Sequence, residues 1–141
     1  MSNFTDTEMS VQHMMKISSD PKNVTRVESF VERLAEKYQI SPDVYGNILI
    51  SLTEAVTNAI VHGNAQDKSK CVFVKLRKLK DRIAFLISDE GGGFDYSNLP
   101  DPTAPENLLK IGGRGVFLMR QLSDDIAFSD NGSTVEICFK I

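Results

Sequence analysis

Two segments in the first half of the chain carry apolar residues at the three- and four-residue spacing of an amphipathic helix. The first begins at Asp20-Pro21, an N-cap aspartate with proline at the first helical position, and predicts a helix over 21–38. The second repeats this start signal at Ser41-Pro42 and ends at Gly63, a residue type that commonly follows a helix. Its apolar stripe consists of Ile48, Leu49, Leu52, Ala55, Val56, Ala59 and Ile60.

The other apolar segments are short and favour strands. Alternation over 72–76 predicts a half-buried strand, and the continuous apolar run over 83–87 predicts a central one, with Lys80-Asp81 in the turn between them. Further short elements are expected as a strand over 11–18, a helix after Gly115, and strands over 126–128 and 134–141 around an Asp130-Asn131-Gly132 turn.

Length and composition favour one folded domain over 11–141, preceded by a disordered polar N-terminus over 1–10. A chain of 141 residues with 41% hydrophobic residues can bury a full core. The net charge of −3 gives no electrostatic footprint for direct nucleic-acid binding. Seven of the 16 basic residues lie between positions 68 and 82, which indicates either a solvated hairpin or a docking surface for an acidic partner.

The two cysteines, Cys71 and Cys138, lie in apolar, strand-like runs and form no CxxC or Cys/His cluster. They are expected to be buried free thiols, as in a reducing cytosol. The N-terminus lacks the apolar core of a signal peptide, and no run approaches the ~18 apolar residues of a membrane span. The expectation is a cytoplasmic protein without a membrane segment.

Glycine is concentrated beside polar residues in the second half of the chain. Glu54, Asn58 and His62 are spaced by four along one edge of the apolar stripe of the second helix. Six of the nine glycines follow in two clusters, one at 91–93 and one at 112, 113 and 115. Because glycine is costly to order, this concentration indicates a ligand that approaches the backbone closely.

Glu54 can accept a proton, and Asn58 can bind a metal ion. Magnesium takes few protein oxygens and completes its shell with water and phosphate, so the carbonyl of Asn58 alone can serve it. Glu54, one turn earlier, can accept a proton from a hydroxyl that attacks a γ-phosphate. The ordinary alternatives are a structural asparagine and an exposed helical glutamate. For His62, a hydrogen bond at the helix end is favoured over catalysis.

The two glycine clusters suggest a base site and a phosphate site. Asp89 ends an apolar strand, where its carboxylate can accept a hydrogen bond from an exocyclic amine such as that of adenine, or can simply be a turn aspartate. Gly91 and Gly93 allow close approach of the backbone to a flat base.

Gly113 and Gly115 flank Arg114 at the start of a helix, whose free amides favour phosphate. Arg114 and Lys110 add positive charge there, and Arg114 can stabilise a transferring phosphoryl group or be an ordinary surface arginine. The segment 95–111 between the clusters has three prolines and no apolar periodicity, which predicts a lid.

Three common nucleotide-binding patterns are absent from the sequence. There is no GxxxxGK[ST] phosphate loop, the glycines after Ser88 do not lead directly into a helix as in a dinucleotide fold, and the HRD and DFG signatures of protein kinases do not occur.

The three segments together resemble the GHKL ATPase superfamily of gyrase, heat-shock chaperone, histidine kinase and mismatch-repair ATPases. Glu54…Asn58-Ala59…His62-Gly63 resembles its N box, 89–94 (DEGGGF) its first glycine box, and Gly113-Arg114-Gly115-Val116 its second. Within the superfamily the chain looks most like the bacterial anti-sigma-factor serine/threonine kinases. Val116 departs mildly from the usual Leu, Ile or Met, and no histidine-bearing dimerisation helix precedes the boxes.

This resemblance implies an α/β fold, an α+β two-layer sandwich in which helices cover one face of a mixed sheet. It implies ATP as the nucleotide, Mg²⁺ on Asn58, Glu54 as general base, Asp89 on the adenine amine and Arg114 near the γ-phosphate. Further residues that would shape or contact the pocket are Gly91, Gly93, Lys110, Gly113, Gly115 and Thr134.

The function expected from the resemblance is an ATP-dependent kinase that phosphorylates an anti-sigma-factor antagonist in a partner-switching pathway. Members of the family also sequester a sigma factor, usually as homodimers. Two alternatives stay open at this point, a non-catalytic ATP/ADP-dependent binding module and an ATPase that serves another complex. Glu54 favours the kinase, because binding alone does not require a general base.

Overall fold

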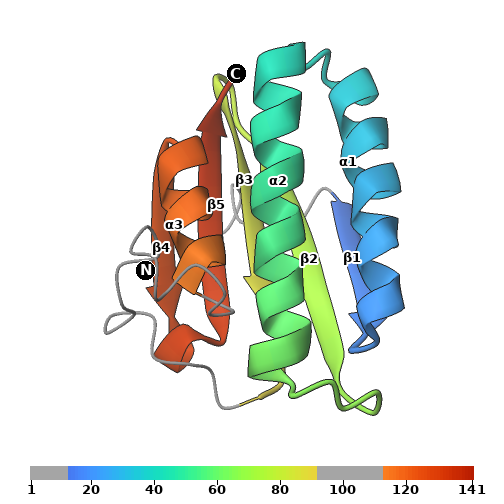
Figure 1. The fold of residues 1–141 in the computed structure, drawn as a ribbon. Helices are drawn as coiled ribbons and strands as arrows, with labels where there is room; N and C mark the ends of the chain where they lie inside the picture. The colour runs from blue at the N-terminus through green and yellow to red at the C-terminus, as the bar shows by residue number, and fades with distance from the viewer. Residues whose placement is uncertain (1–12, 92–112) are drawn as a thin grey trace.

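The computed structural model describes residues 13–91 and 113–141, which form a helical layer packed on one face of a β-sheet (Figure 1). The strands are β1 (His13–Ser18), β2 (Cys71–Lys78), β3 (Arg82–Ser88), β4 (Asp125–Ser129) and β5 (Thr134–Lys140). The helices are α1 (Thr25–Lys37), α2 (Pro42–Asn58) and α3 (Gly113–Leu122), with short helical turns over Pro21–Val24, Ala59–Gly63 and Asp130–Gly132. The predicted two-layer α/β class is therefore confirmed.

The five strands are ordered β1-β2-β3-β5-β4, and each neighbouring pair is antiparallel. The expected mixed sheet is wrong for these strands. The connection through α3 does carry the chain from β3 to a strand of the same direction, β4, but β4 lies at the edge of the sheet. The β4–β5 hairpin then inserts β5 beside β3, so no two parallel strands are neighbours.

The core lies between the sheet and α2, the helix at the centre of the helical layer (Figure 1). On α2, Ile48, Leu52, Val56 and Ile60 are fully buried, as the helical stripe predicts. Every second residue of the strands faces them; Val72, Val74 and Leu76 of β2 are also fully buried. Truncating one such side chain, for example Leu52→Ala, would cost about 2–5 kcal/mol of the free energy of unfolding.

The segment Pro42–Gly63 is long and apolar enough to cross a membrane by length and composition, with a mean hydropathy of 1.3. Core helices of soluble proteins share this property. Here the apolar stripe of the segment is covered by the sheet and α1, which explains its composition without a membrane.

The helix starts predicted from the sequence are confirmed. Asp20 accepts a hydrogen bond from the backbone N–H of Lys22 at 3.0 Å, and Ser41 accepts one from Val44 at 3.4 Å. The helix ends differ from expectation in detail. The first helix opens with a 3₁₀ turn before α1, and the second helix finishes as a single π turn over Ala59–Gly63.

Cys71 and Cys138 are free thiols but only half-buried, in contrast to the expected full burial. Strand alternation explains the difference, because both side chains point to the sheet face that the helices do not cover. Burial and the nearby Glu136 and Asp125 carboxylates raise the pKa of the Cys138 thiol to about 11, so this thiol stays protonated at neutral pH.

Candidate functional site

The candidate site begins at the C-terminal end of α2, where Glu54 and Asn58 lie one turn apart. Asn58 is buried, with 4% of its surface exposed, and Glu54 is half-buried. The helix changes from α to π immediately after Asn58. Such π turns occur often at functional sites, because they change the direction of the side chains that follow.

The start of α3 lies directly against these two side chains. A Cβ atom added to Gly115 would fall 2.8 Å from Oε2 of Glu54 and 3.2 Å from Nδ2 of Asn58. The second glycine box therefore packs on the N box, as expected for one site. Glycine at 115 leaves space for the Glu54 carboxylate, which lies against the position that a Cβ would take.

Asn58 carries unused hydrogen-bonding capacity inside the protein. Its Nδ2 atom is buried and has no hydrogen-bond partner among the described residues. A buried polar group without a partner is costly, and it calls for an explanation such as a bound ion or ligand. Rotation of the amide by half a turn exchanges its oxygen and nitrogen with little change in shape. Asn58 therefore fits the role of a group that binds a ligand.

A metal at this site would depend on few protein atoms. Within residues 13–91 and 113–141, no group of three or more His, Cys, Asp or Glu side chains is placed to hold an ion. Magnesium fits such a site better than zinc does, because it retains waters and binds substrate phosphates. Asn58 is the described residue that suits it.

Asp89 packs against the other end of the N box. A Cβ atom added to Gly63 would fall 2.1 Å from Oδ2 of Asp89, and one added to Gly91 would fall 1.6 Å from the carbonyl oxygen of Gly63. Gly63 was expected to close the helix as a C-terminal glycine. The helical segment does end at Gly63, as expected, but the positive φ angles after it belong to Ala65 and Gln66, and Gly63 also provides room for the Asp89 carboxylate.

Hydrogen bonds fix the Asp89–Gly91 turn, which carries the expected base-binding carboxylate. The Asp89 N–H donates to the carbonyl of Ser133 at 2.9 Å, and the Gly91 N–H donates to Oδ1 of Asp89 at 2.9 Å. Burial raises the pKa of the Asp89 carboxyl, against the opposing effects of the Gly91 N–H and of Lys70. Burial thus disfavours the ionised carboxylate at this half-buried position. Such energetically unfavourable placement of a charged group is typical of functional sites.

A narrow pocket of about 10 Å³ joins these elements. Asn58 and Ala59 line it on α2 and the π turn, Asp89 and Ser133 line it at the strand ends, and Met119 lines it on α3. This volume holds about one water molecule, so a nucleobase can enter only when the walls separate.

The remaining predicted residues are distributed as follows. Gly113 and Arg114 lie in the first turn of α3, beside Gly115. Gly93, Lys110 and the expected lid over 95–111 lie outside the described residues. Thr134 is paired with Ser88 in the β3–β5 ladder, one residue from Asp89, but its hydroxyl donates to Oδ2 of Asp130 at 3.2 Å.

Sequence reasoning missed two residues that hold the site. Ser133 supplies the carbonyl that binds the Asp89 N–H. Asn64 is 1% exposed, and its Oδ1 atom accepts a hydrogen bond from the N–H of Glu90 at 2.8 Å. In the sequence, Asn64 appears only as a polar residue after a helix-ending glycine, so no local signal indicates a long-range contact.

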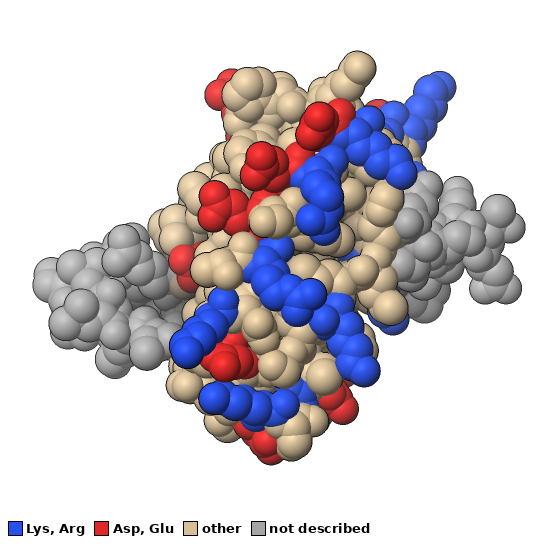
Figure 2. All heavy atoms as spheres, turned by 90° about the vertical axis from the view of Figure 1, so that its right-hand side faces the viewer, with Lys and Arg blue, Asp and Glu red and all other residues tan. Residues whose placement is uncertain are grey.

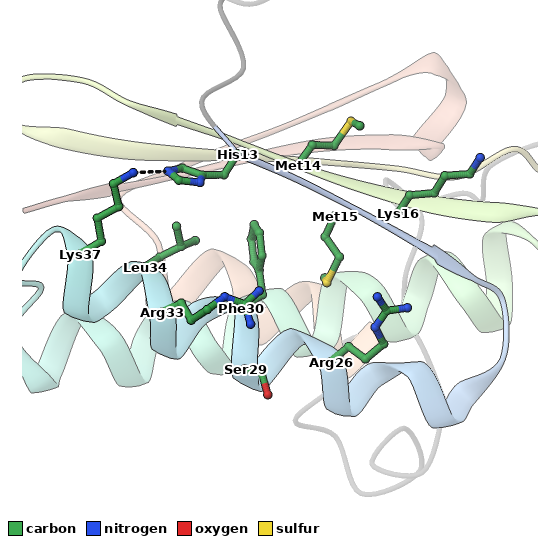
Figure 3. A pocket seen from close by; sticks show the side chains of 10 residues that line it. All are labelled: His13, Met14, Met15, Lys16, Arg26, Ser29, Phe30, Arg33, Leu34 and Lys37. Atoms are coloured by element: carbon green, nitrogen blue, oxygen red, sulfur yellow. Dashed lines mark hydrogen bonds between the residues drawn. The ribbon is translucent and has the colours of Figure 1, made fainter.

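A second, larger hollow lies between β1 and α1 (Figure 3). These two elements lie on the other side of α2 from α3 (Figure 1). This basic groove has a volume of about 670 Å³ and combines an apolar floor with cationic walls. Its residues are His13, Met14, Met15, Lys16, Arg26, Ser29, Phe30, Arg33, Leu34 and Lys37.

The cationic residues of the basic groove lie on β1 and α1. Among the described residues, no ion pair to Arg26 or Arg33 is formed, and Lys37 contacts the ring nitrogen Nε2 of His13 at 3.3 Å. Burial and Lys37 lower the pKa of His13, which is consistent with a neutral ring that accepts from the ammonium group. Figure 2 shows Lys and Arg side chains gathered over this side of the molecule.

Comparison with known proteins identifies the family of the chain. Residues 17–139 match the model of the histidine kinase-like ATPase domain. The chain belongs to this family. The match spans all the described elements that form the site, from α2 to β5.

Curated relatives of the chain are named serine-protein kinase RsbW. The protein of this name from Bacillus licheniformis is 31% identical over 130 residues, which cover 87% of this chain and 81% of the relative. That from Bacillus subtilis (strain 168) is 27% identical over 128 residues, covering 86% and 80%. A Staphylococcus aureus (strain JH9) protein of the same name is 26% identical over 131 residues, covering 87% and 82%.

Proposed function

We propose that this chain is an ATP-dependent serine/threonine protein kinase and anti-sigma factor that phosphorylates an anti-sigma-factor antagonist. The relatives carry the name of a serine-protein kinase over about four fifths of their length. The single observation that supports the proposal is the close approach of Gly115 to Glu54 and Asn58, a carboxylate and an amide beside the start of a helix.

The proposed roles of the residues follow from their chemistry. Asn58 would hold Mg²⁺, which when bound neutralises charge on the phosphates of ATP. Glu54 would accept the proton of the attacking serine or threonine hydroxyl, which is supported by its half-buried position beside the start of α3, the proposed phosphate site. Asp89 accepts a hydrogen bond from the adenine amine.

The start of α3 is the proposed phosphate site. The backbone amides of the first turn, which contains Gly113 and Gly115, point out of the helix and attract anions. Arg114 and Lys110 add the positive charge that a transferring phosphoryl group needs. Gly91 and Gly93 give the base access to the backbone, and Thr134 completes the edge of the base pocket.

The proposed partners are an antagonist protein as substrate, a sigma factor as a second partner, and a second copy of the chain in a homodimer. Binding of a protein at a distance from the nucleotide is physically reasonable, because the basic groove lies on the far side of α2. We expect the protein to act in the cytoplasm, without contact to membrane or nucleic acid.

The decisive experiment is transfer of phosphate to the native substrate. The purified chain is used to recover proteins from native lysate with Mg-ADP and with Mg-ATP, and the recovered small protein is then incubated with labelled ATP. Wild type should label a serine or threonine, and Glu54→Gln should bind ATP normally but transfer about 10²–10⁴-fold more slowly.

Glu28→Gln, an exposed glutamate in the first turn of α1, serves as the control and should transfer at the wild-type rate. Equal transfer by Glu54→Gln would remove Glu54 as the base. Nucleotide-dependent recovery of proteins without any phosphate transfer would favour the alternative of a non-catalytic binding module.

A further inference from the structure

Asn64 connects three segments that are distant in the sequence. Its Nδ2 atom donates to Oγ of Ser19 at 2.8 Å and to the carbonyl of Cys71 at 3.0 Å. Its Oδ1 atom accepts from the N–H of Glu90 at 2.8 Å. With 1% of its surface exposed, Asn64 is a buried polar residue whose hydrogen bonds are made to the end of β1, the start of β2 and the turn after β3.

The turn after β3 is the one that carries Asp89. Of its three successive amides, that of Asp89 is bound by the Ser133 carbonyl and that of Gly91 by the Asp89 carboxylate. The amide between them, that of Glu90, is bound by the side chain of Asn64. Asn64 thus holds the middle of the turn.

The adjacent Gly63 fixes the distance between this turn and α2. The Gly91 backbone lies so close to the Gly63 carbonyl that an added Cβ would be 1.6 Å from its oxygen. The dipeptide Gly63-Asn64 therefore forms a seat for the turn, in which Gly63 provides the space and Asn64 the hydrogen bond.

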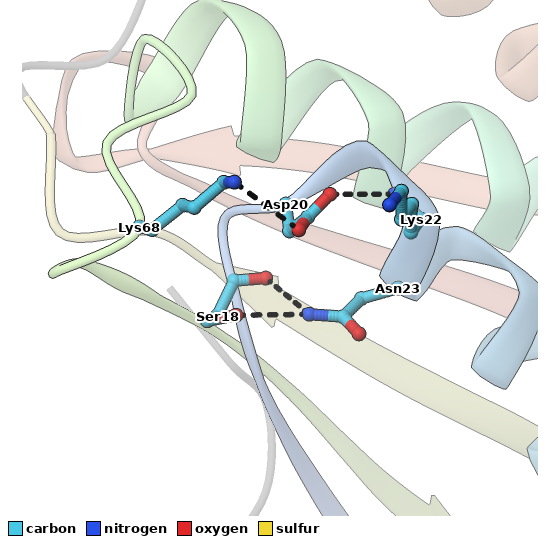
Figure 4. A network of polar contacts seen from close by, with 5 residues as sticks. All are labelled: Ser18, Asp20, Lys22, Asn23 and Lys68. Carbon is cyan, nitrogen blue, oxygen red and sulfur yellow. Dashed lines mark hydrogen bonds and ion pairs between the residues drawn. The ribbon is translucent and has the colours of Figure 1, made fainter.

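The other side of Asn64 is anchored where the end of β1 meets the start of β2. The backbone N–H and the Oγ of Ser19 both donate to the Lys70 carbonyl, at 3.0 and 2.8 Å. Flanking residues are fixed as well (Figure 4): Asn23 donates to both oxygens of Ser18, and Asp20 pairs with Lys68 at 3.5 Å. Because β1 and β2 hold its nitrogen, the amide of Asn64 cannot follow the turn if the turn moves.

We propose that Asn64 is a positioning residue for the nucleotide base, which it serves by fixing the Asp89–Gly91 turn through the Glu90 amide. It does not touch the nucleotide. This inference rests on the proposed role of Asp89 as the acceptor for adenine. It assigns part of the base selectivity of the site to a residue on the far side of the turn. Loss of the Glu90 hydrogen bond then weakens nucleotide binding and the preference for adenine, while the transfer step at Glu54 is left intact.

The test compares the affinities of full-length variants for ADP and GDP, measured by calorimetry below their melting temperatures. Asn64→Ala should weaken ADP binding about tenfold and reduce the ADP-to-GDP preference, because a poorly placed acceptor discriminates less. Ser19→Ala removes one of the two acceptors that hold Nδ2 of Asn64 but keeps the Cys71 carbonyl and the Glu90 bond, so its loss of ADP affinity should be smaller than that of Asn64→Ala.

Asn64→Asp provides a rescue test, since burial favours its protonated carboxyl, which donates to the Cys71 carbonyl and still accepts from the Glu90 N–H. Its ADP affinity should exceed that of Asn64→Ala, and it also serves if Asn64→Ala does not fold. Equal losses in Asn64→Ala and Ser19→Ala, unchanged base preference, or a failure of Asn64→Asp to bind better would overturn the inference. Failure of wild type to bind ADP would instead contradict the proposed nucleotide site.

Discussion

Gly115 on α3 lies over the carboxylate of Glu54 on α2, so close that a Cβ at position 115 would be 2.8 Å from Oε2 of Glu54. The same Cβ would be 3.2 Å from Nδ2 of Asn58. This contact joins two segments about sixty residues apart. The position of the Glu54 carboxylate, the proposed base, therefore depends on the absence of a side chain at residue 115 of the neighbouring helix.

The first prediction concerns Gly115→Ala. The clash falls on the flexible end of Glu54, so the carboxylate should move while the fold stays intact. Because alanine is the better helix former by about 1 kcal/mol, stability should be unchanged or slightly raised. Phosphate transfer should nevertheless fall at least about tenfold, since the base is displaced. Steady-state kinetics and thermal melting measure the two effects.

Gly46→Ala is the matched control for this experiment. Gly46 also lies inside a helix, and an added Cβ there meets no atom within 4 Å. Its stability should rise by about 0.5–1 kcal/mol with activity unchanged. A Gly115→Ala protein that retains full activity would show that Glu54 tolerates the shift and that its observed position is not critical.

Asn58→Ala should separate metal binding from folding. Because Nδ2 of Asn58 has no partner among the described residues, its removal breaks no hydrogen bond to them, and the melting temperature should change little. The factor by which magnesium increases the affinity for ATP should then be at least about tenfold smaller than in wild type. Titrations of ATP with and without Mg²⁺ measure this ratio.

Ser51→Ala is a suitable comparison, since Oγ of Ser51 is also buried without a partner among the described residues. It lies about two turns earlier in α2 and should leave the magnesium effect unchanged. Retention of the full magnesium effect in Asn58→Ala would exclude Asn58 as the ligand.

Asp89→Asn should affect stability and binding in opposite directions. Burial raises the folded-state pKa of Asp89 above its usual 3.8, so the ionised form is disfavoured by folding. The wild-type protein therefore loses stability as the pH rises from 3.8 through the folded-state pKa. At neutral pH the neutral asparagine avoids this cost, and the variant should melt at a higher temperature.

This advantage of Asp89→Asn should shrink as the pH falls toward 3.8, where Asp89 becomes protonated in both states. Its affinity for ADP should fall at neutral pH, because the carboxylate acceptor is lost. Melting curves across this pH range, with calorimetry for ADP, test both effects. A variant that melts lower than wild type at neutral pH would contradict the burial argument.

The basic groove gives a prediction about protein partners. Arg33 has no ion pair among the described residues, so Arg33→Glu should leave the fold and ATP affinity unchanged. If an acidic partner docks there, the variant should bind it at least about tenfold more weakly, and the loss should diminish at high salt. Lys140→Glu, which reverses the charge of an exposed side chain at the end of β5, is the control. Equal affinity of both variants would place the partner elsewhere.

Local signals in the sequence predicted the elements well, because they act within a few residues. The caps at Asp20 and Ser41 were confirmed, and so was the buried stripe of α2. Gly63 shows the limit of such signals. It ends the helical segment, as expected, and its lack of a side chain also makes room for Asp89, which lies 26 residues later. The local sequence shows a glycine at position 63, but it does not show that the Asp89 carboxylate will pack against it.

By itself the sequence determined the helices, the strands and the residue types of a nucleotide site, since periodicity and side-chain chemistry are properties of short segments. Tertiary structure decided which segments meet. It placed β5 beside β3 in an antiparallel sheet, Gly115 on Glu54, and Asn64 between β1, β2 and the Asp89 turn. Such contacts depend on the packing of the whole core, because steric fit and buried hydrogen bonds join residues that no local pattern relates.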